Sequence, residues 1–177
     1  MTRFTSILVA NRGEIACRVI RTARAQGYRT IAVYSEADAR APHVQMADEA
    51  YLIGPPPVNQ SYLNIDVIIG QAVRANADLI HPGYGLLSEN ASFADKVRSA
   101  GLIWIGPSPK TISSMADKGK ARDIAIKVGL PVLPGSPSLN VEDEALLIEN
   151  AIDIGFPLLV KATGGGGGIG MRVAESL

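Results

Sequence analysis

The chain has 177 residues, and its 17 lysines and arginines balance its 17 aspartates and glutamates, so the formal net charge is zero. Without a basic surplus the sequence gives no sign of a nucleic-acid partner, which requires many cations on one face. Apolar residues make up 47% and charged residues 19% of the chain, a composition typical of a globular protein and not of a disordered one.

The first predicted unit is a strand, a tight turn and a helix. Residues 6–10 form a short apolar run that is typical of a buried strand. Residues 11–13 contain the turn signal Asn-Arg-Gly, and residues 15–26 repeat apolar positions at helical spacing. Gly27 follows as a helix stop.

The same alternation continues through the first part of the chain. Short apolar runs that end in turn signals predict strands at residues 30–34, 50–53, 78–81 and 102–105. Helical patterns lie between them, at residues 42–46, at 65–75 after Asn64, and from Ser88 or Asn90 to about Gly101. Such alternation implies right-handed crossovers, so we expect an α/β domain over residues 1–110: an open parallel sheet with helices on both faces, Rossmann-like.

Residues beyond 110 show a different pattern. A helix is predicted over residues 117–128, a proline-rich linker over 131–137, and a second helix over 141–154 that opens with acidic residues. We therefore expect residues 111–140 to be a helical connection and linker, and residues 141–177 to begin another domain. Since two strands do not make a stable sheet unaided, this part should be less protected than the first domain.

A glycine-rich run at residues 163–170 is the strongest local signal. Successive glycines allow backbone N–H groups to approach an anion closely. Its flanks, residues 158–162 and 171–173, are strand-like, whereas a dinucleotide fingerprint would open a helix and a Walker loop would end in Gly-Lys-Ser/Thr. Strand periodicity places Lys161 toward the start of the loop. We interpret the run as a lid over phosphates; a flexible linker beside a solvated lysine is the alternative.

The apolar segments and the cysteine content of the chain bear on its cellular location. The apolar run at residues 6–10 is far shorter than the roughly 20 residues of a membrane span and too short for a signal-peptide core. Cys17 is the only cysteine, so no internal disulfide forms. We expect no membrane association and a cytoplasmic protein, or one of the mitochondrial matrix in a eukaryote, although no transit peptide is seen.

Six short motifs spread over the whole chain carry a family resemblance. They are Asn11-Arg-Gly-Glu-Ile-Ala16, Ser61-Tyr-Leu-Asn64, His81-Pro-Gly-Tyr-Gly85, Leu87-Ser-Glu-Asn90, Ile105-Gly-Pro107 and Lys161-Ala-Thr-Gly-Gly-Gly-Gly-Gly168. Together and in this order they resemble the amino-terminal part of biotin carboxylase. This is the ATP-grasp subunit or domain of biotin-dependent acyl-CoA, pyruvate and urea carboxylases.

The resemblance implies an ATP-dependent ligase that carboxylates the biotin of a biotin carboxyl carrier protein with bicarbonate, through carboxyphosphate. Mg²⁺ accompanies the ATP, a carboxyltransferase is a further partner, and a homodimer is expected. The same resemblance implies three groups of site residues. Tyr84 and Gly85 border biotin, and Arg18 and Arg21 lie at the dimer interface. The residues that contact the nucleotide phosphates are Lys118, Lys161, Gly164, Gly165, Gly166, Gly167 and Gly168.

Some features depart from the family pattern. Ile169 stands where the family carries Arg or Lys, which removes a cation beside the phosphates. The family's magnesium-holding carboxylates and general base come later than Leu177, so no catalytic or metal-binding residue is assigned. We therefore expect a truncated biotin carboxylase that shows no carboxylation by itself.

Several readings remain open at this point. One alternative is a non-catalytic dimerisation or regulatory module with the same fold. Another is a part of a different ATP-grasp ligase such as carbamoyl phosphate synthase, which shares part of residues 81–90. For His81 we expect a local hydrogen bond at a strand end, and for Asn11, Arg12 and Glu14 we expect turn and capping roles.

Overall fold

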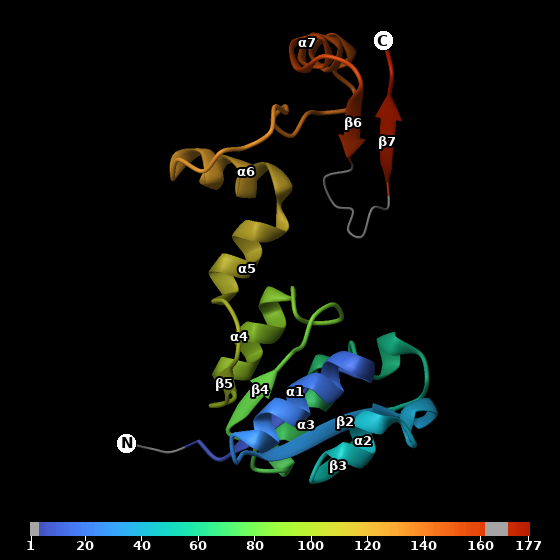
Figure 1. The fold of residues 1–177 in the computed structure, drawn as a ribbon, viewed down its shortest axis with the longest axis vertical. Coiled ribbons are helices and arrows are strands. Elements are labelled where there is room, and N and C mark those ends of the chain that lie inside the picture. Colours follow the sequence, from blue (N-terminus) through green and yellow to red (C-terminus); the bar gives the residue numbers. More distant parts are fainter. Residues whose placement is uncertain (1–3, 162–169) are drawn as a thin grey trace. The chain divides into compact units, whose positions relative to one another are not determined.

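The computed structural model describes residues 4–161 and 170–177. The chain divides into two compact units, Met1–Ser113 and Ser114–Leu177 (Figure 1). Among the described residues, no helix is both long and apolar enough to cross a membrane.

The first unit is built on a five-stranded sheet in which every neighbouring pair is parallel. The strands lie side by side in the order β3-β2-β1-β4-β5. In the central strand, Leu8 is in register with Ile31 on one side and Ile80 on the other. The predicted open parallel sheet is confirmed. Its strands are β1 (Ser6–Val9), β2 (Arg29–Ser35), β3 (Glu49–Gly54), β4 (Leu79–His81) and β5 (Ile103–Trp104).

Helices cover both faces of this sheet, as predicted (Figure 1). Because side chains alternate along a strand, Leu8 packs in a cluster with Ile68 and Phe93, while Val9 packs with Ile20 on the other face. The crossover elements are α1 (Gly13–Ala25), α2 (Pro42–Met46), α3 (Ile65–Arg74) and α4 (Ala91–Ser99), with short 3₁₀ turns η1 (Glu36–Asp38) and η2 (Val58–Gln60).

Asparagine caps fix where two of these helices begin. The Asn64 side chain accepts a hydrogen bond from the Val67 amide at 3.2 Å, which starts α3. The Asn90 side chain accepts from the Phe93 amide at 2.9 Å, so Asn90 and not Ser88 caps α4. Each bond satisfies an amide that the helix itself leaves without an acceptor.

One helix was not expected from the sequence. α5 (Pro109–Ala116) begins where the sequence suggested only a turn that closes the fifth strand. Ser108 is the residue before it, and its hydroxyl oxygen accepts a hydrogen bond from the Thr111 amide at 3.1 Å. A serine followed by proline at the first helical position is a known start signal, and it was present in the sequence.

The second unit contains two helices and a hairpin: α6 (Lys118–Lys127), α7 (Glu144–Ile154), β6 (Leu158–Lys161) and β7 (Met171–Ala174). Aspartate side chains cap both helices, Asp117 for α6 and Asp143 for α7, each at 3.1 Å from an amide. Because Asp143 is the cap, α7 begins at Glu144 and not at residue 141 as predicted. β6 and β7 pair antiparallel.

Candidate functional site

The strand order reverses direction between β1 and β4. The chain moves from β1 to β2 on one side, while β4 and β5 lie on the other. In open α/β sheets, ligands bind in the crevice outside the carboxyl ends of the strands at such a switch point. Here the residues that leave β1, Asn11–Glu14, face the residues that leave β4, Pro82–Gly85, as the hydrogen bonds between them show.

Asn11 joins the two strand ends. It is buried, and its side-chain nitrogen donates to the carbonyl oxygens of Pro82 at 2.7 Å and Tyr84 at 2.9 Å. Its side-chain oxygen accepts from the Arg12 amide at 2.8 Å. Just below, the Ala10 amide donates to the His81 carbonyl at 2.8 Å, so the contact continues the β1–β4 pairing.

Tyr84 lies at the surface of this crevice. The residue is 62% exposed, and its hydroxyl donates to the carboxylate of Glu14 in the first turn of α1. That hydrogen bond raises the pKa of Tyr84, because losing the phenolic proton would leave two negative charges in contact. The predicted biotin-pocket residues Tyr84 and Gly85 therefore stand at the switch point, next to the motif that follows β1.

A second polar cluster follows β2. Asp38 accepts hydrogen bonds from the hydroxyls of Tyr62 at 2.7 Å and Ser35 at 2.8 Å, and Arg12 approaches it at 3.5 Å. The Arg12 guanidinium also lies 5.2 Å from the centre of the Tyr62 ring. Burial raises the pKa of Asp38, but these hydrogen bonds and the Arg12 charge outweigh it, so the pKa is lowered.

This cluster was not predicted from the sequence. Tyr62 belongs to one of the quoted motifs, but nothing local links it to an aspartate at residue 38. The Tyr62 ring and the Asp38 carboxylate together hold the Arg12 guanidinium close to the crevice.

His81 ends β4 and makes the local hydrogen bond that the sequence predicted. Its Nδ1 accepts from the Gly83 amide at 2.9 Å, so the neutral ring carries its hydrogen on Nε2. Burial and the nearby Arg18 charge lower the pKa of His81. A hollow of about 230 Å³ lies here. His81 lines it together with Arg18 and Thr22 of α1, Tyr28 and Ile105.

Arg18 and Arg21 are both exposed on α1, and Arg18 also lines the hollow beside His81. Their role at a dimer interface stays a prediction.

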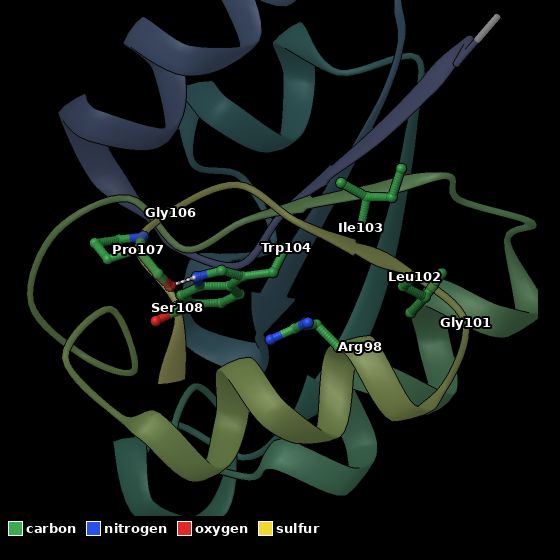
Figure 2. A pocket seen from close by; sticks show the side chains of 8 residues that line it. All are labelled: Arg98, Gly101, Leu102, Ile103, Trp104, Gly106, Pro107 and Ser108. Carbon is green, nitrogen blue, oxygen red and sulfur yellow. Dashed lines mark hydrogen bonds between the residues drawn. The ribbon is translucent and has the colours of Figure 1, made fainter. Parts of the chain in front are cut away.

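A larger hollow, of about 480 Å³, opens beside α4 and β5 (Figure 2). The indole N–H of Trp104 donates to the Pro107 carbonyl oxygen at 3.0 Å, which holds the loop after β5 against the ring. Arg98 and Ser108 supply its polar side chains. None of the predicted site residues lines it, and its lining lacks a carboxylate, thiol or imidazole.

The predicted nucleotide-binding residues belong to the second unit. Lys118 is the first residue of α6 and Lys161 is the last residue of β6, and both are exposed. Lys161 is in register with Met171, so two paired strands flank the glycine-rich run, as predicted. Gly164, Gly165, Gly166, Gly167, Gly168 and Ile169 lie outside the described residues. Within residues 4–161 and 170–177, no cluster of three His, Cys, Asp or Glu side chains could hold a metal ion.

Comparisons with protein families divide the chain in two. The family described as "Biotin carboxylase, N-terminal domain" matches residues 3–112. The family described as "Carbamoyl-phosphate synthase L chain, ATP binding domain" matches residues 117–177.

Similar curated proteins are carboxylases. The mitochondrial methylcrotonoyl-CoA carboxylase subunit alpha of Dictyostelium discoideum is 52% identical over 97% of this chain and 24% of its own length. Biotin carboxylase 2 of Bacillus subtilis is 51% identical over 98% of this chain and 39% of its own length. The chain thus spans about a quarter to two-fifths of the length of these relatives.

Solved structures agree in fold. A biotin carboxylase from Campylobacter jejuni, in complex with a β,γ-ATP compound, superposes with a TM-score of 0.92, at 45% identity over 98% of this chain and 39% of the other. The biotin carboxylase domain dimer of the 2-oxoglutarate carboxylase from Hydrogenobacter thermophilus, in complex with MgADP, ADP and bicarbonate, gives a TM-score of 0.90, at 44% identity over 99% of this chain and 38% of the other.

Proposed function

The chain belongs to the biotin carboxylase family, and on that premise we propose that it is the amino-terminal part of an ATP-dependent ligase that carboxylates carrier-bound biotin. Residues 1–110 form the amino-terminal α/β domain, residues 111–140 the helical connection and linker, and residues 141–177 the beginning of the ATP-grasp domain. The compartment is the cytoplasm, or the mitochondrial matrix in a eukaryote.

The reaction joins phosphoryl transfer to carboxyl transfer. A bicarbonate oxygen attacks the γ-phosphorus of ATP, which releases ADP and forms carboxyphosphate. Carboxyphosphate then yields phosphate and CO₂, and the ureido nitrogen of biotin takes up the CO₂ as it loses its proton. Phosphoryl transfer of this kind depends mainly on positioning and on neutralising phosphate charge, for which Mg²⁺ supplies part of the positive charge.

This chain's contribution to nucleotide binding is its pair of lysines and the glycine-rich run. The observation that carries the proposal is that β6 and β7 pair around this run, with the exposed Lys161 as the last residue of β6. We assign the Lys161 ammonium group and the backbone amides of Gly164–Gly168 to the nucleotide phosphates, since successive glycine amides can bind an anion. Lys118, at the first position of α6, supplies a second cation.

The first unit contributes the surfaces for biotin and for partners. Tyr84 and Gly85 border the biotin pocket at the crevice between β1 and β4, beside Asn11 and Glu14. A biotin carboxyl carrier protein brings the biotin, and a carboxyltransferase uses the product. Arg18 and Arg21 form part of the homodimer interface on the exposed side of α1.

Nucleotide binding by the chain tests the first part of this proposal. We expect MgATP to bind, and Lys161→Ala to weaken binding about tenfold or more, since a hydrogen bond to a charged group contributes roughly 1.5–3 kcal/mol. Lys127→Ala is the matched control, because it removes the same charge from the last turn of α6 in the same unit. Equal affinities for both variants in equilibrium dialysis would contradict the assignment of Lys161.

Sedimentation tests the interface. Arg21→Glu should shift the chain from dimer toward monomer, whereas Arg98→Glu, the same charge reversal on α4, should leave the dimer intact. A dimer unaffected by Arg21→Glu would remove this residue from the interface.

A further inference from the structure

The turn at residues 82–85 is bound by a buried side-chain amide, in addition to the hydrogen bond that the Gly83 amide donates to His81 Nδ1. Both hydrogens of the Asn11 side-chain nitrogen have acceptors in this turn, the carbonyl oxygens of Pro82 and Tyr84. The side-chain oxygen also has a donor, the Arg12 amide. The amide is 3% exposed and its hydrogen-bonding groups are all used, so its orientation is fixed.

Gly83 shows how closely the turn passes this amide. A Cβ atom at Gly83 would lie 2.6 Å from the Asn11 side-chain nitrogen, which is nearer than atoms can approach without movement. Gly83 also has a φ of +67°, a conformation in which glycine has no steric cost. The absent side chain therefore makes room for the Asn11 amide.

Tyr84 is fixed at two points. Its backbone carbonyl accepts from Asn11, and its phenol donates to Glu14. The residue as a whole is 62% exposed, so little packing determines where its side chain points. Its position depends instead on the backbone of the turn and on the Glu14 carboxylate.

We propose that Asn11 is a positioning residue: it sets the turn at residues 82–85 and thereby keeps the phenol of Tyr84 on Glu14 at the mouth of the crevice. The relevance of this positioning role to catalysis rests on the proposed function, in which Tyr84 borders biotin. A purely structural Asn11 would contribute to stability but would leave the environment of Tyr84 unchanged when it is replaced.

The first experiment measures the titration of Tyr84 in the 177-residue chain, by ¹³C NMR of labelled tyrosine assigned with Tyr84→Phe. In the unmodified chain the Glu14 hydrogen bond raises the pKa of Tyr84. Asn11→Ala should move this pKa toward the ordinary tyrosine value. Asn64→Ala removes an asparagine cap from α3 in the same unit, and it should leave Tyr84 unchanged. An unchanged Tyr84 in Asn11→Ala would overturn the proposal.

A double-mutant cycle tests the contact from its other side. Gly83→Ala should destabilise the chain and displace Tyr84, because the new methyl group meets the Asn11 amide. In the Asn11→Ala background that collision is gone, while the cost of a positive φ is the same in both backgrounds and cancels. Gly83→Ala should therefore lower the free energy of unfolding by less in the Asn11→Ala background than in the unmodified chain. Strictly additive costs would contradict the contact, and Gly83→Ala reports on Tyr84 even if Asn11→Ala does not fold.

Free biotin separates this inference from the proposed function. Biotin added to the unmodified chain should shift the NMR signals of Tyr84 and Gly85, and the shift should shrink in Asn11→Ala. If biotin shifts neither signal, the biotin assignment fails, while the Tyr84 titration still decides the role of Asn11. If biotin shifts these signals equally in the unmodified chain and in Asn11→Ala, the biotin assignment is supported and the positioning role of Asn11 is contradicted.

Discussion

The two units of the chain form similar elements but bury very different amounts of apolar surface. In the first unit Ile20 and Phe93 are fully buried, and every strand contributes at least one buried side chain. In the second unit no residue within 114–161 or 170–177 is buried, and Ile152 and Leu133 are 57% and 84% exposed. Both units nevertheless cap helices with the same chemistry, at Asn90 and at Asp143.

This difference separates what forms a helix from what stabilises it. A side-chain cap contributes about 1 kcal/mol, and isolated helices of ten or so residues are marginal in water. A two-stranded hairpin is equally marginal alone. Burial of apolar surface, at roughly 25 cal/mol per Å², is what raises a unit above this level. We therefore expect the first unit to carry the stability of the chain.

Hydrogen exchange should show the largest contrast. Amides of β1, β2 and β4 should exchange only through unfolding of the first unit, at about 5 kcal/mol or more, or at least a thousandfold protection. Amides of α6, α7 and β6 should exchange through local opening, with little protection. Equal protection in both units would break the comparison.

A pair of isoleucine substitutions comes next. Ile20→Ala empties a fully buried position in α1 and should cost about 2–5 kcal/mol. Ile152→Ala makes the same change in α7, where the side chain is 57% exposed, and should leave the first unit unaffected. Fluorescence of Trp104, the only tryptophan, reports on unfolding of the first unit. Similar losses for both variants would mean that the second unit shares the core.

Acid should weaken the first unit through Asp78. Its carboxylate accepts hydrogen bonds from the amides of Thr5 and Ser6, at 2.8 and 3.0 Å, and from both hydroxyls. These bonds lower the pKa of Asp78 below its unfolded value of about 3.9. The stabilisation is therefore present above that pH and is lost as the pH falls through the lower, folded pKa.

Asp78→Asn should remove this pH dependence and lower stability at neutral pH by about 1.5–3 kcal/mol, the range for a hydrogen bond to a charged group. Asp153→Asn, the same change in α7, should alter neither. An acid transition unchanged by Asp78→Asn would show that another carboxylate governs it.

Caps give the smallest contrast. Asn90→Ala should cost the first unit about 1 kcal/mol, because the Phe93 amide loses its acceptor. Asp143→Ala removes the equivalent bond to the Leu146 amide in α7 and should lower local helicity without a shift in the Trp104 transition. A shift in that transition would indicate that the two units unfold together.

The errors of the sequence analysis cluster where local patterns compete. The fifth strand was predicted over residues 102–105, but only Ile103 and Trp104 pair with β4. α5 was missed because the prolines between residues 106 and 109 suggested a turn, although Ser108 and Pro109 also fit a helix start. α7 begins at Glu144 because only one of three successive acidic residues can be the cap.

The site shows the same division. The motifs predicted Tyr84 and Gly85 as biotin-pocket residues. They did not predict the hydrogen bond between Tyr84 and Glu14, or the hydrogen bond that the Asn11 side chain donates to the Tyr84 carbonyl oxygen. The association of Asp38 with Tyr62 was equally invisible. Each of these contacts joins segments that are distant in the sequence, and no pattern of spacing encodes them.

The sequence by itself determined the alternation of strands and helices, the parallel sheet that follows from it, and the paired strands around the glycine-rich run. These depend on apolar periodicity and on turn and cap chemistry, which act over a few neighbouring residues. Only the tertiary structure decided that β1 lies beside β4 and that Asn11 meets the turn at Gly83. Such contacts arise because burying both faces of the sheet brings distant strand ends together, and the partners of a buried polar group are chosen by that packing.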